Sequence, residues 1–180
     1  MINLDELYIV HYCHSYCAPF QNICRLPKEE AFLLADKMAA DNPDTEAFYR
    51  FADFENYYPH RIQVDTYLYE LFVSLGGKPK EKHPLSFVLQ GSTYLDSWFS
   101  HGNISKIRLK NIPPDSISFT YGDSGATLKR DGKLTMQTKE MLFIAMGNYT
   151  GTSDGFMKEI EEKHGYIEVQ LWDDDYCHPE

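Results

Sequence analysis

The stretch HYCHSYCAPFQNIC, residues 11–24, concentrates side chains that could do chemistry. It holds three of the four cysteines and two of the seven histidines in the chain. Thiolates and imidazoles bind zinc, and a thiolate beside an imidazole can act as a nucleophile with its base. The same residues therefore allow three interpretations: a metal site, a catalytic thiol, or the buried end of a strand.

The metal interpretation rests on the spacing of Cys13 and Cys17, which occurs in zinc sites. Cys24, or the distant pair Cys177-His178, could complete four ligands. Structural zinc sites usually present two compact ligand pairs, and here the second pair is missing or lies at the end of the chain. We therefore expect no metal and no cofactor.

The thiol interpretation centres on Cys24, three residues before Pro27, which opens a predicted helix. A helix N-terminus lowers the pKa of a nearby thiol, and His11 or His14 could serve as the base. No known nucleophile signature surrounds these residues.

A strand that ends in His11-Tyr12 is similar to the first motif strand of ADP-ribosyltransferases. That resemblance implies downstream Tyr and Glu residues, for which the groups Tyr67–Tyr69–Glu70 and Tyr166–Glu168 are the candidates. A small enzyme that uses the 11–24 stretch, by thiol chemistry or in this manner, stays open as an alternative.

The third interpretation is structural, because free cysteines behave as small buried hydrophobes and a histidine beside tyrosine often only completes hydrogen bonds. We favour it, and so expect a protein that acts by binding. A concave pocket holding His11, Cys13 or Cys17 with converging polar groups would instead support the enzyme.

The composition is that of a globular protein, with 43% hydrophobic residues among 180. No apolar run approaches the roughly 20 residues that span a bilayer, and the N-terminus lacks the basic region of a signal peptide. Cysteines in such a chain are expected to be reduced. We therefore expect a cytoplasmic protein without a membrane partner.

The net charge of -10 is unevenly distributed. Residues 26–77 carry four basic against ten acidic side chains, and residues 140–180 two against ten, whereas residues 78–139 carry ten against five. This distribution argues against direct, sequence-specific DNA binding, which needs clustered Lys and Arg. It suits a basic, nucleic-acid-binding protein as the partner.

The periodicity predicts an α+β fold, with an antiparallel sheet, an early helical segment and two late helices. Strands are expected at 6–11, 85–89, 104–112, 116–121, 126–129, 133–137 and 166–172, and helices at 27–41, 44–51, 59–75, 92–99, 138–146 and 154–164. Asp131-Gly132 is expected to turn a hairpin. Residues 1–180 are predicted to form one domain, with a possible acidic helical part at 26–77, a linker at 76–84 and a β-rich part at 84–180.

HYCHSYCAPFQNICRLPKEEAF (11–32) and HPLSFVLQGSTYLDSWF (83–99) resemble small acidic proteins on mobile elements of gut bacteria. Some of those are anti-CRISPR proteins that inhibit Cas9. The resemblance implies a stoichiometric inhibitor that binds Cas9 with its guide RNA and blocks DNA binding or cleavage.

Acids interleaved with aromatics mark the surfaces expected to meet such a partner, because Cas9 has positively charged channels. The first candidate surface comprises Asp41, Asp44, Glu46, Asp53, Phe54, Glu55, Tyr57 and Tyr58, and the second comprises Asp173, Asp174 and Asp175.

Overall fold

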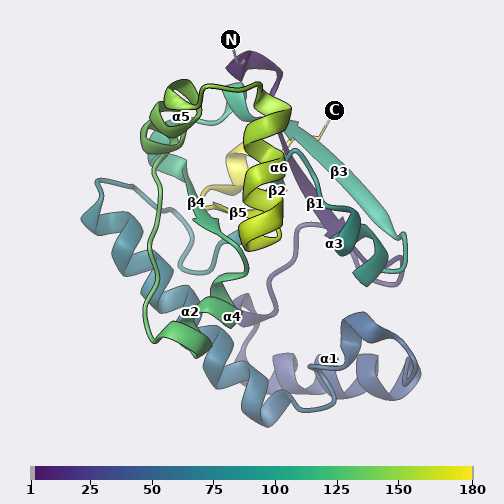
Figure 1. Cartoon of the computed structure of the whole chain (residues 1–180). Helices are drawn as coiled ribbons and strands as arrows, with labels where there is room; N and C mark the ends of the chain where they lie inside the picture. Colours follow the sequence, from purple (N-terminus) through teal and green to yellow (C-terminus); the bar gives the residue numbers. More distant parts are fainter. Residues whose placement is uncertain (1–2, 180) are drawn as a thin grey trace.

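The computed structural model describes residues 3–179, which form a five-stranded antiparallel sheet with helices on both faces (Figure 1). This confirms the predicted α+β class. The strands are β1 (Tyr8–Cys13), β2 (Leu85–Leu89), β3 (Asn103–Arg108), β4 (Ile117–Tyr121) and β5 (Ile167–Leu171), in the order β3-β1-β2-β5-β4. The two ends of the chain therefore contribute β1 and β5, which lie on either side of β2.

The helices are α1 (Lys28–Asp41), α2 (Phe54–Ser74), α3 (Thr93–Trp98), α4 (Ser124–Asp131), α5 (Lys139–Asn148) and α6 (Ser153–His164). Local chemistry sets several of their ends. The Ser92 and Thr138 side chains accept hydrogen bonds from the first turns of α3 and α5, and Gly165 ends α6 with a φ of 85°. None of the helices formed by residues 3–179 combines the length and apolar character needed to cross a membrane.

Alternation along β5 gives the sheet two different faces. Ile167, Val169 and Leu171 point to one face, where they pack with residues of α5 and α6; we call this the apolar face. Glu168 and Gln170 point to the other, the polar face. Because directly paired residues share a face, the polar face also carries Ser86, Val88, Ser118 and Thr120.

The polar face is covered at one end by α2 and α4. Trp172, fully buried just after β5, stacks on Phe72 of α2 with ring centroids 5.3 Å apart, and Leu68 and Leu128 complete this cluster. The expected linker is fixed at the same place, since the Lys80 and Glu81 backbone N–H groups donate to the Trp172 carbonyl. The second half of α2 is thereby held against the sheet.

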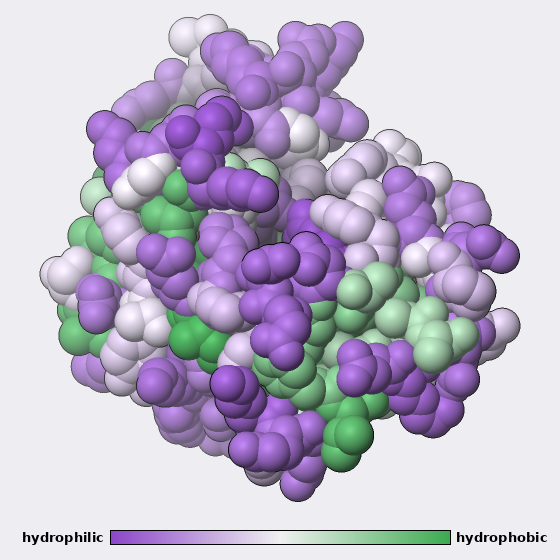
Figure 2. Space-filling model, turned by 90° about the horizontal axis from the view of Figure 1, so that it is seen from below, coloured by the Kyte–Doolittle hydropathy of each residue, from purple (hydrophilic) through white to green (hydrophobic). Residues whose placement is uncertain are grey.

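A smaller cluster forms around Ala31, Ala35 and Phe54, below the sheet in Figure 1. We call residues 23–58 the α1 lobe. Helix α1 completely buries only its two alanines, Phe32 packs partly buried against their cluster, and Leu33 is 70% exposed. Figure 2, which views the molecule from below, shows apolar residues gathered in a patch bordered by hydrophilic ones.

Four local predictions are wrong. Residues 124–131 form helix α4 instead of half a hairpin, because Asp123 caps its N-terminus and Gly132, at φ 69°, ends it. Residues 133–137 form no strand beyond a single bridge between Gln137 and Phe119. Helix α2 begins at Phe54 and takes Pro59 into its second turn, although Pro59 was expected to open it. Strand β3 also ends at Arg108, four residues early.

Candidate functional site: a cleft over the polar face

A cleft of about 920 Å³ opens between the α1 lobe and the polar face of the sheet. Its volume lies in the range of small-molecule sites. A second hollow of about 360 Å³ shares Tyr12, Gly165 and Tyr166 with it. The lining includes Val10, Tyr12, Ser86, Val88 and Glu168 of the sheet, Leu34, Met38, Phe48, Arg50, Phe51, Tyr57 and Arg61 of the α1 lobe and α2, Tyr94, Leu95, Trp98 and Phe99 around α3, and Asp123 and Ala126 beside α4.

Aromatic rings join the two sides of this cleft. Tyr49, in the α1 lobe, meets Trp98 of α3 edge to face with centroids 5.6 Å apart, and Tyr94 lies 6.0 Å from the same indole. Such contacts add to the free energy of burial while leaving ring faces available. The cleft is therefore bounded by aromatic surface on the α3 side and on the lobe side.

Arg50 is the cationic side chain of the α1 lobe in the cleft. Its guanidinium lies 5.5 Å from the ring centroids of both Tyr49 and Tyr57, and its Nε donates to the Tyr49 hydroxyl at 2.9 Å. Burial alone would lower the pKa of Arg50, but the hydrogen bond to Tyr49 and the nearby Tyr57 and Asp123 raise it above its usual range. Arg50 therefore remains a cation.

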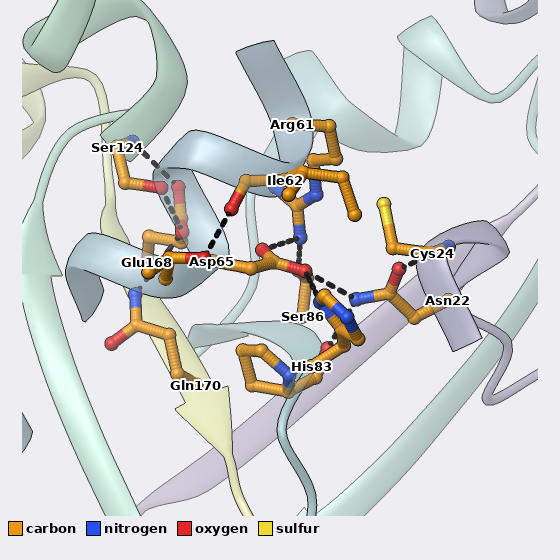
Figure 3. Close-up of polar contacts among 12 residues, drawn as sticks. Asn22, Cys24, Arg61, Ile62, Asp65, His83, Ser86, Ser124, Glu168 and Gln170 are labelled. Atoms are coloured by element: carbon orange, nitrogen blue, oxygen red, sulfur yellow. Dashed lines mark hydrogen bonds and ion pairs between the residues drawn. The ribbon is translucent and has the colours of Figure 1, made fainter. Parts of the chain in front are cut away.

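Asp65 is the centre of a buried network on α2 (Figure 3). Its carboxylate is fully buried, and its Oδ1 lies 3.1 Å from Arg61 Nη2. Oδ2 accepts hydrogen bonds from His83 Nδ1 at 2.8 Å and from the Asn22 amide at 3.2 Å. We call these four residues the Asp65 network. It fastens the 11–24 stretch and the 76–84 segment to α2, and it places Arg61 within 3.4 Å of Ser86 Oγ on the sheet.

Glu168 is the buried acid of the polar face. Its Oε2 accepts from the Ser124 backbone N–H at 2.8 Å, and its Oε1 accepts from the Ser124 hydroxyl at 2.7 Å and from the Gln170 amide at 3.1 Å. Burial and the charge of Asp123 raise the pKa of Glu168, while the hydrogen bonds from Ser124 oppose that shift. An acid with a raised pKa in a cleft is typical of functional sites.

A row of hydrogen bonds continues from Glu168 across the polar face. Trp172 Nε1 donates to Ser118 Oγ at 2.9 Å, and the Ser118 hydroxyl donates to Gln170 Oε1 at 2.8 Å. The Gln170 amide then donates to Thr120 Oγ1 at 3.0 Å. Each buried polar side chain in this row thus has a partner, as stable interiors require. The row fixes the rotamer of Gln170 and, through it, the carboxyl of Glu168.

Asp123 brings a second acid close to Glu168. Its Oδ1 accepts from the Ala126 N–H at 2.6 Å as the cap of α4, and its Oδ2 accepts from the Tyr166 hydroxyl at 3.4 Å. Burial, followed by the charges of Asp123 and Glu168, raises the pKa of Tyr166, so this phenol stays protonated. The start of α4 therefore aligns two carboxyl groups and a phenol along the cleft.

His11 does not act as a free base, although it was a candidate for that role. Its ring packs between Phe20 and Phe87, with centroids 5.1 and 5.3 Å away. Nδ1 donates to the Ser86 carbonyl at 2.9 Å, and Nε2 accepts from the Phe20 N–H at 3.1 Å. Because both nitrogens are occupied and burial lowers the pKa of His11, the ring is neutral.

The cysteines of the 11–24 stretch are free thiols and are not activated. Burial raises the pKa of Cys13 and of Cys17. Burial and the charge of Asp65 together raise the pKa of Cys24 to about 12. A thiol with such a pKa is protonated at neutral pH and is a poor nucleophile. The local geometry therefore gives the thiol-enzyme alternative no activated sulfur.

Cys24 has neighbours that its spacing from Cys13 and Cys17 did not suggest. Its Sγ, an Asp65 oxygen and a His83 nitrogen lie within 4.8 Å of one another. Among the described residues this is the group whose atoms could hold a metal. The Asp65 oxygen that faces His83 already accepts two hydrogen bonds, and Arg61 is close, so a cation would have to displace the proton on His83 Nδ1.

The first candidate partner surface divides between exposed acids and packed aromatics. Phe54 is buried in the lobe cluster, Tyr58 contacts the rings of Phe32 and Phe54, and Tyr57 lines the cleft. Asp41 pairs with Lys37, one turn earlier in α1. The exposed acids that form no ion pair with the described residues are Asp44, Glu46, Asp53 and Glu55.

The three acids of the second candidate surface all form ion pairs within the chain. Asp173 is buried and lies 2.9 Å from Lys80, which also pairs with Asp175 at 2.6 Å. Asp174 pairs with Arg25 at 2.6 Å. These three acids hold Lys80 of the 76–84 segment and Arg25, just after the 11–24 stretch, to the end of β5.

Comparison with protein-family models, with curated proteins and with solved structures finds no match to this chain. The candidate site therefore rests on geometry. The residues that sequence reasoning missed are Arg50, Arg61, Asp65, Asp123 and the pairing of Glu168 with Ser124. One signal was present: Arg61 and Asp65 stand four apart on a helix, the spacing of an intrahelical ion pair.

Proposed function

We propose that the chain acts through the cleft, by binding a small organic molecule whose ring packs against the aromatic walls. The observation that carries this proposal is the composition of the cleft: apolar and aromatic walls around about 920 Å³, with Arg50, Asp123 and Glu168 converging on it. A few placed polar groups in an apolar concavity are the usual pattern of ligand sites.

The electrostatics support the same proposal. Placing Glu168 where its pKa is raised costs folding free energy, because the charged form is disfavoured. Ionisable groups with perturbed pKa values inside a cleft are typical of sites under selection for binding or chemistry.

The same geometry meets the condition set for the enzyme alternative, since His11, Cys13 and Cys17 line a pocket that contains polar groups. Those three residues are not the reactive ones, however, because the thiols are protonated and the imidazole is occupied. Glu168 and Asp123 are the groups able to exchange protons with a bound molecule. Any catalysis in the cleft would accordingly be acid–base chemistry.

The test is to fill the cleft. Anilinonaphthalene sulfonate, a dye with aromatic rings and one sulfonate, should bind the native protein at one site. Ala126→Trp, on the cleft wall, should weaken that binding by about 10-fold or more. Ala40→Trp, an exposed alanine of α1 that does not line the cleft, is the matched control. Equal dye affinity in the two variants would contradict the proposal.

A second candidate function is inhibition of a basic nucleic-acid effector such as guide-loaded Cas9. One observation favours it: Asp44, Glu46, Asp53 and Glu55 are exposed and without ion pairs among the described residues. Unpaired charges at the edge of a surface accelerate association with an oppositely charged partner.

Surface plasmon resonance against Cas9 with guide RNA would test this second function. Asp53→Lys with Glu55→Lys should slow association and weaken its salt dependence, whereas Glu161→Lys with Glu162→Lys, exposed acids on α6, should change it less. Absence of binding at micromolar concentration would remove the Cas9 hypothesis.

A further inference from the structure

We infer that the ligand of the cleft is a nucleoside phosphate, with its phosphate held by Arg50 and its base against the aromatic side chains near Trp98. The inference rests on the proposed function of the cleft. Three observations support it: the unpaired nitrogens of Arg50, the aromatic rings of Tyr94 and Trp98, and the polar groups of Tyr12 and Asp123.

The two arginines of the cleft differ in which of their guanidinium nitrogens already have a partner. Arg61 is committed to Asp65 at 3.1 Å and to Ser86 at 3.4 Å. Arg50 uses only Nε, which donates to Tyr49. Its two terminal nitrogens form no hydrogen bond or ion pair with the described residues, although the side chain lines the cleft. A planar guanidinium with two free nitrogens matches the oxygens of a phosphate.

Tyr49 and Tyr57 hold that guanidinium in place. Both rings lie 5.5 Å from it, so the group is oriented before any ligand arrives. Orientation of this kind lowers the entropy that binding costs. The arrangement therefore favours Arg50 as an anion receptor over Arg50 as a freely moving surface charge.

The ring of the ligand has a matching surface on the α3 side. Trp98 and Tyr94 line the cleft beside Phe99, and Trp98 meets Tyr49 only edge to face. Indole and phenol faces stack on nucleobases with little regard to base identity. Tyr94 and Trp98 belong to α3, a helix of six residues that follows β2.

The polar floor distinguishes a nucleoside phosphate from a simple aromatic acid. Tyr12 accepts a hydrogen bond from the Ser92 N–H through its hydroxyl oxygen, which leaves its own proton to donate. Asp123 offers carboxylate oxygens that accept from hydroxyl or amino groups. A sugar with several hydroxyl groups and a base with amino groups would use these partners, whereas an aromatic acid would leave them desolvated and unpaired.

The experiment measures equilibrium binding through the fluorescence of Trp98, since Trp172 is fully buried against Phe72. The ligands are adenosine and guanosine monophosphates, the corresponding nucleosides, and inorganic phosphate. Either monophosphate should bind about 10- to 100-fold more tightly than its nucleoside. Arg50→Gln should weaken monophosphate binding by a similar factor, and Arg130→Gln, an exposed arginine outside the cleft, should leave it unchanged.

Equal affinity for nucleoside and monophosphate in the wild-type protein would overturn the inference without depending on any variant. So would retention of full affinity in Arg50→Gln, or no binding of either monophosphate. In each of these cases the dye titration of Ala126→Trp still decides whether the cleft binds ligands at all. The two proposals therefore fail separately.

Discussion

The two faces of the sheet are built from the same strands and serve different ends. On the apolar face, Phe119, Ile167 and Val169 are fully buried in one cluster with residues of α5 and α6, without a polar side chain from β5 among them. On the polar face, one residue along the same strand, Glu168 and Gln170 are just as buried but are hydrogen-bonded. Strand alternation thus separates packing from the residues that could meet a ligand.

The two faces also differ in how completely helices cover them. Helices α5 and α6 close the apolar face, whereas α2 covers the polar face only where Trp172 anchors it. The first turns of α2 pack on α1 through Phe54 and Tyr58, and the cleft opens beside them, where Arg61 lines it. The cleft therefore opens where α2 stops packing on the sheet, and Glu168 of β5 lines it.

Removal of Asp65 should have the largest effect. Asp65→Ala removes the fully buried carboxylate that Arg61, His83 and Asn22 share, and we expect a loss of about 3–5 kcal/mol in the free energy of unfolding. Urea denaturation measures it. Replacing the ion pair by apolar groups, Asp65→Leu with Arg61→Met, should recover most of the loss, because no unpaired charge then remains. A loss below about 1 kcal/mol in Asp65→Ala would show that the pair is not buried as described.

A truncation on the apolar face should destabilise the protein by a similar or smaller amount, and it should leave ligand binding in the cleft unchanged. Leu171→Ala removes a fully buried side chain, so we expect a loss of about 2–5 kcal/mol in the free energy of unfolding. Dye affinity of the remaining folded protein should stay within about twofold of wild type. Ile144→Ala, an exposed position on α5, is the control and should cost less than about 0.5 kcal/mol.

His11 and Glu168, whose pKa values are shifted in opposite directions, should give opposite pH dependences. The pKa of His11 is lowered from its ordinary value of 6.5 by burial. The stability it contributes as a neutral ring is therefore present above pH 6.5 and lost as the pH falls through its folded pKa. In His11→Gln, unfolding free energy measured by urea denaturation should decline less on acidification than in the wild type.

Glu168 should show the reverse trend. Its pKa is raised from 4.5, so the stability that its neutral form contributes is present below pH 4.5 and lost as the pH rises through the folded pKa. In Glu168→Gln, unfolding free energy should fall less as the pH rises above 4.5. Parallel pH profiles for wild type and Glu168→Gln would contradict a raised pKa at this site.

The smallest effects are expected at Cys24. Because its thiol is neutral and buried, Cys24→Ala should bind the dye as the wild type does, and native Cys24 should react slowly with iodoacetamide at pH 8. We also expect no bound metal by elemental analysis of the purified protein. About one zinc per chain, lost in Cys24→Ala or His83→Ala, would overturn that expectation and assign a metal to the Asp65 network.

Much of the fold was predictable because its signals are local. Strand β2 has the expected bounds, and α6 ends at the glycine that the sequence offered as its stop. The hairpin at 126–137 was wrong for an equally local reason. A glycine after aspartate supplies a positive φ, which serves a hairpin turn and a helix C-terminus alike, and Gly132 serves the helix.

The candidate site was not predictable from residue spacing. Asn22, Asp65 and His83 are far apart in the sequence and meet only when α2 packs on the sheet. The cysteines of the 11–24 stretch were the candidates for chemistry, but the Asp65 network takes from this stretch the side-chain amide of Asn22. Alternation in YIEVQLW placed Glu168 on a strand but could not show that its face lies under a cleft.

We propose that the ligand binds over the polar face of the sheet and not under α5 and α6. Methyl chemical shifts measured during titration with anilinonaphthalene sulfonate test this most directly. We expect saturable shifts at Val10, Val88 and Leu95, which line the cleft, and none at Leu142 of α5 or at Val169 in the apolar cluster. Shifts confined to the exposed Leu33, or spread over both faces alike, would contradict it.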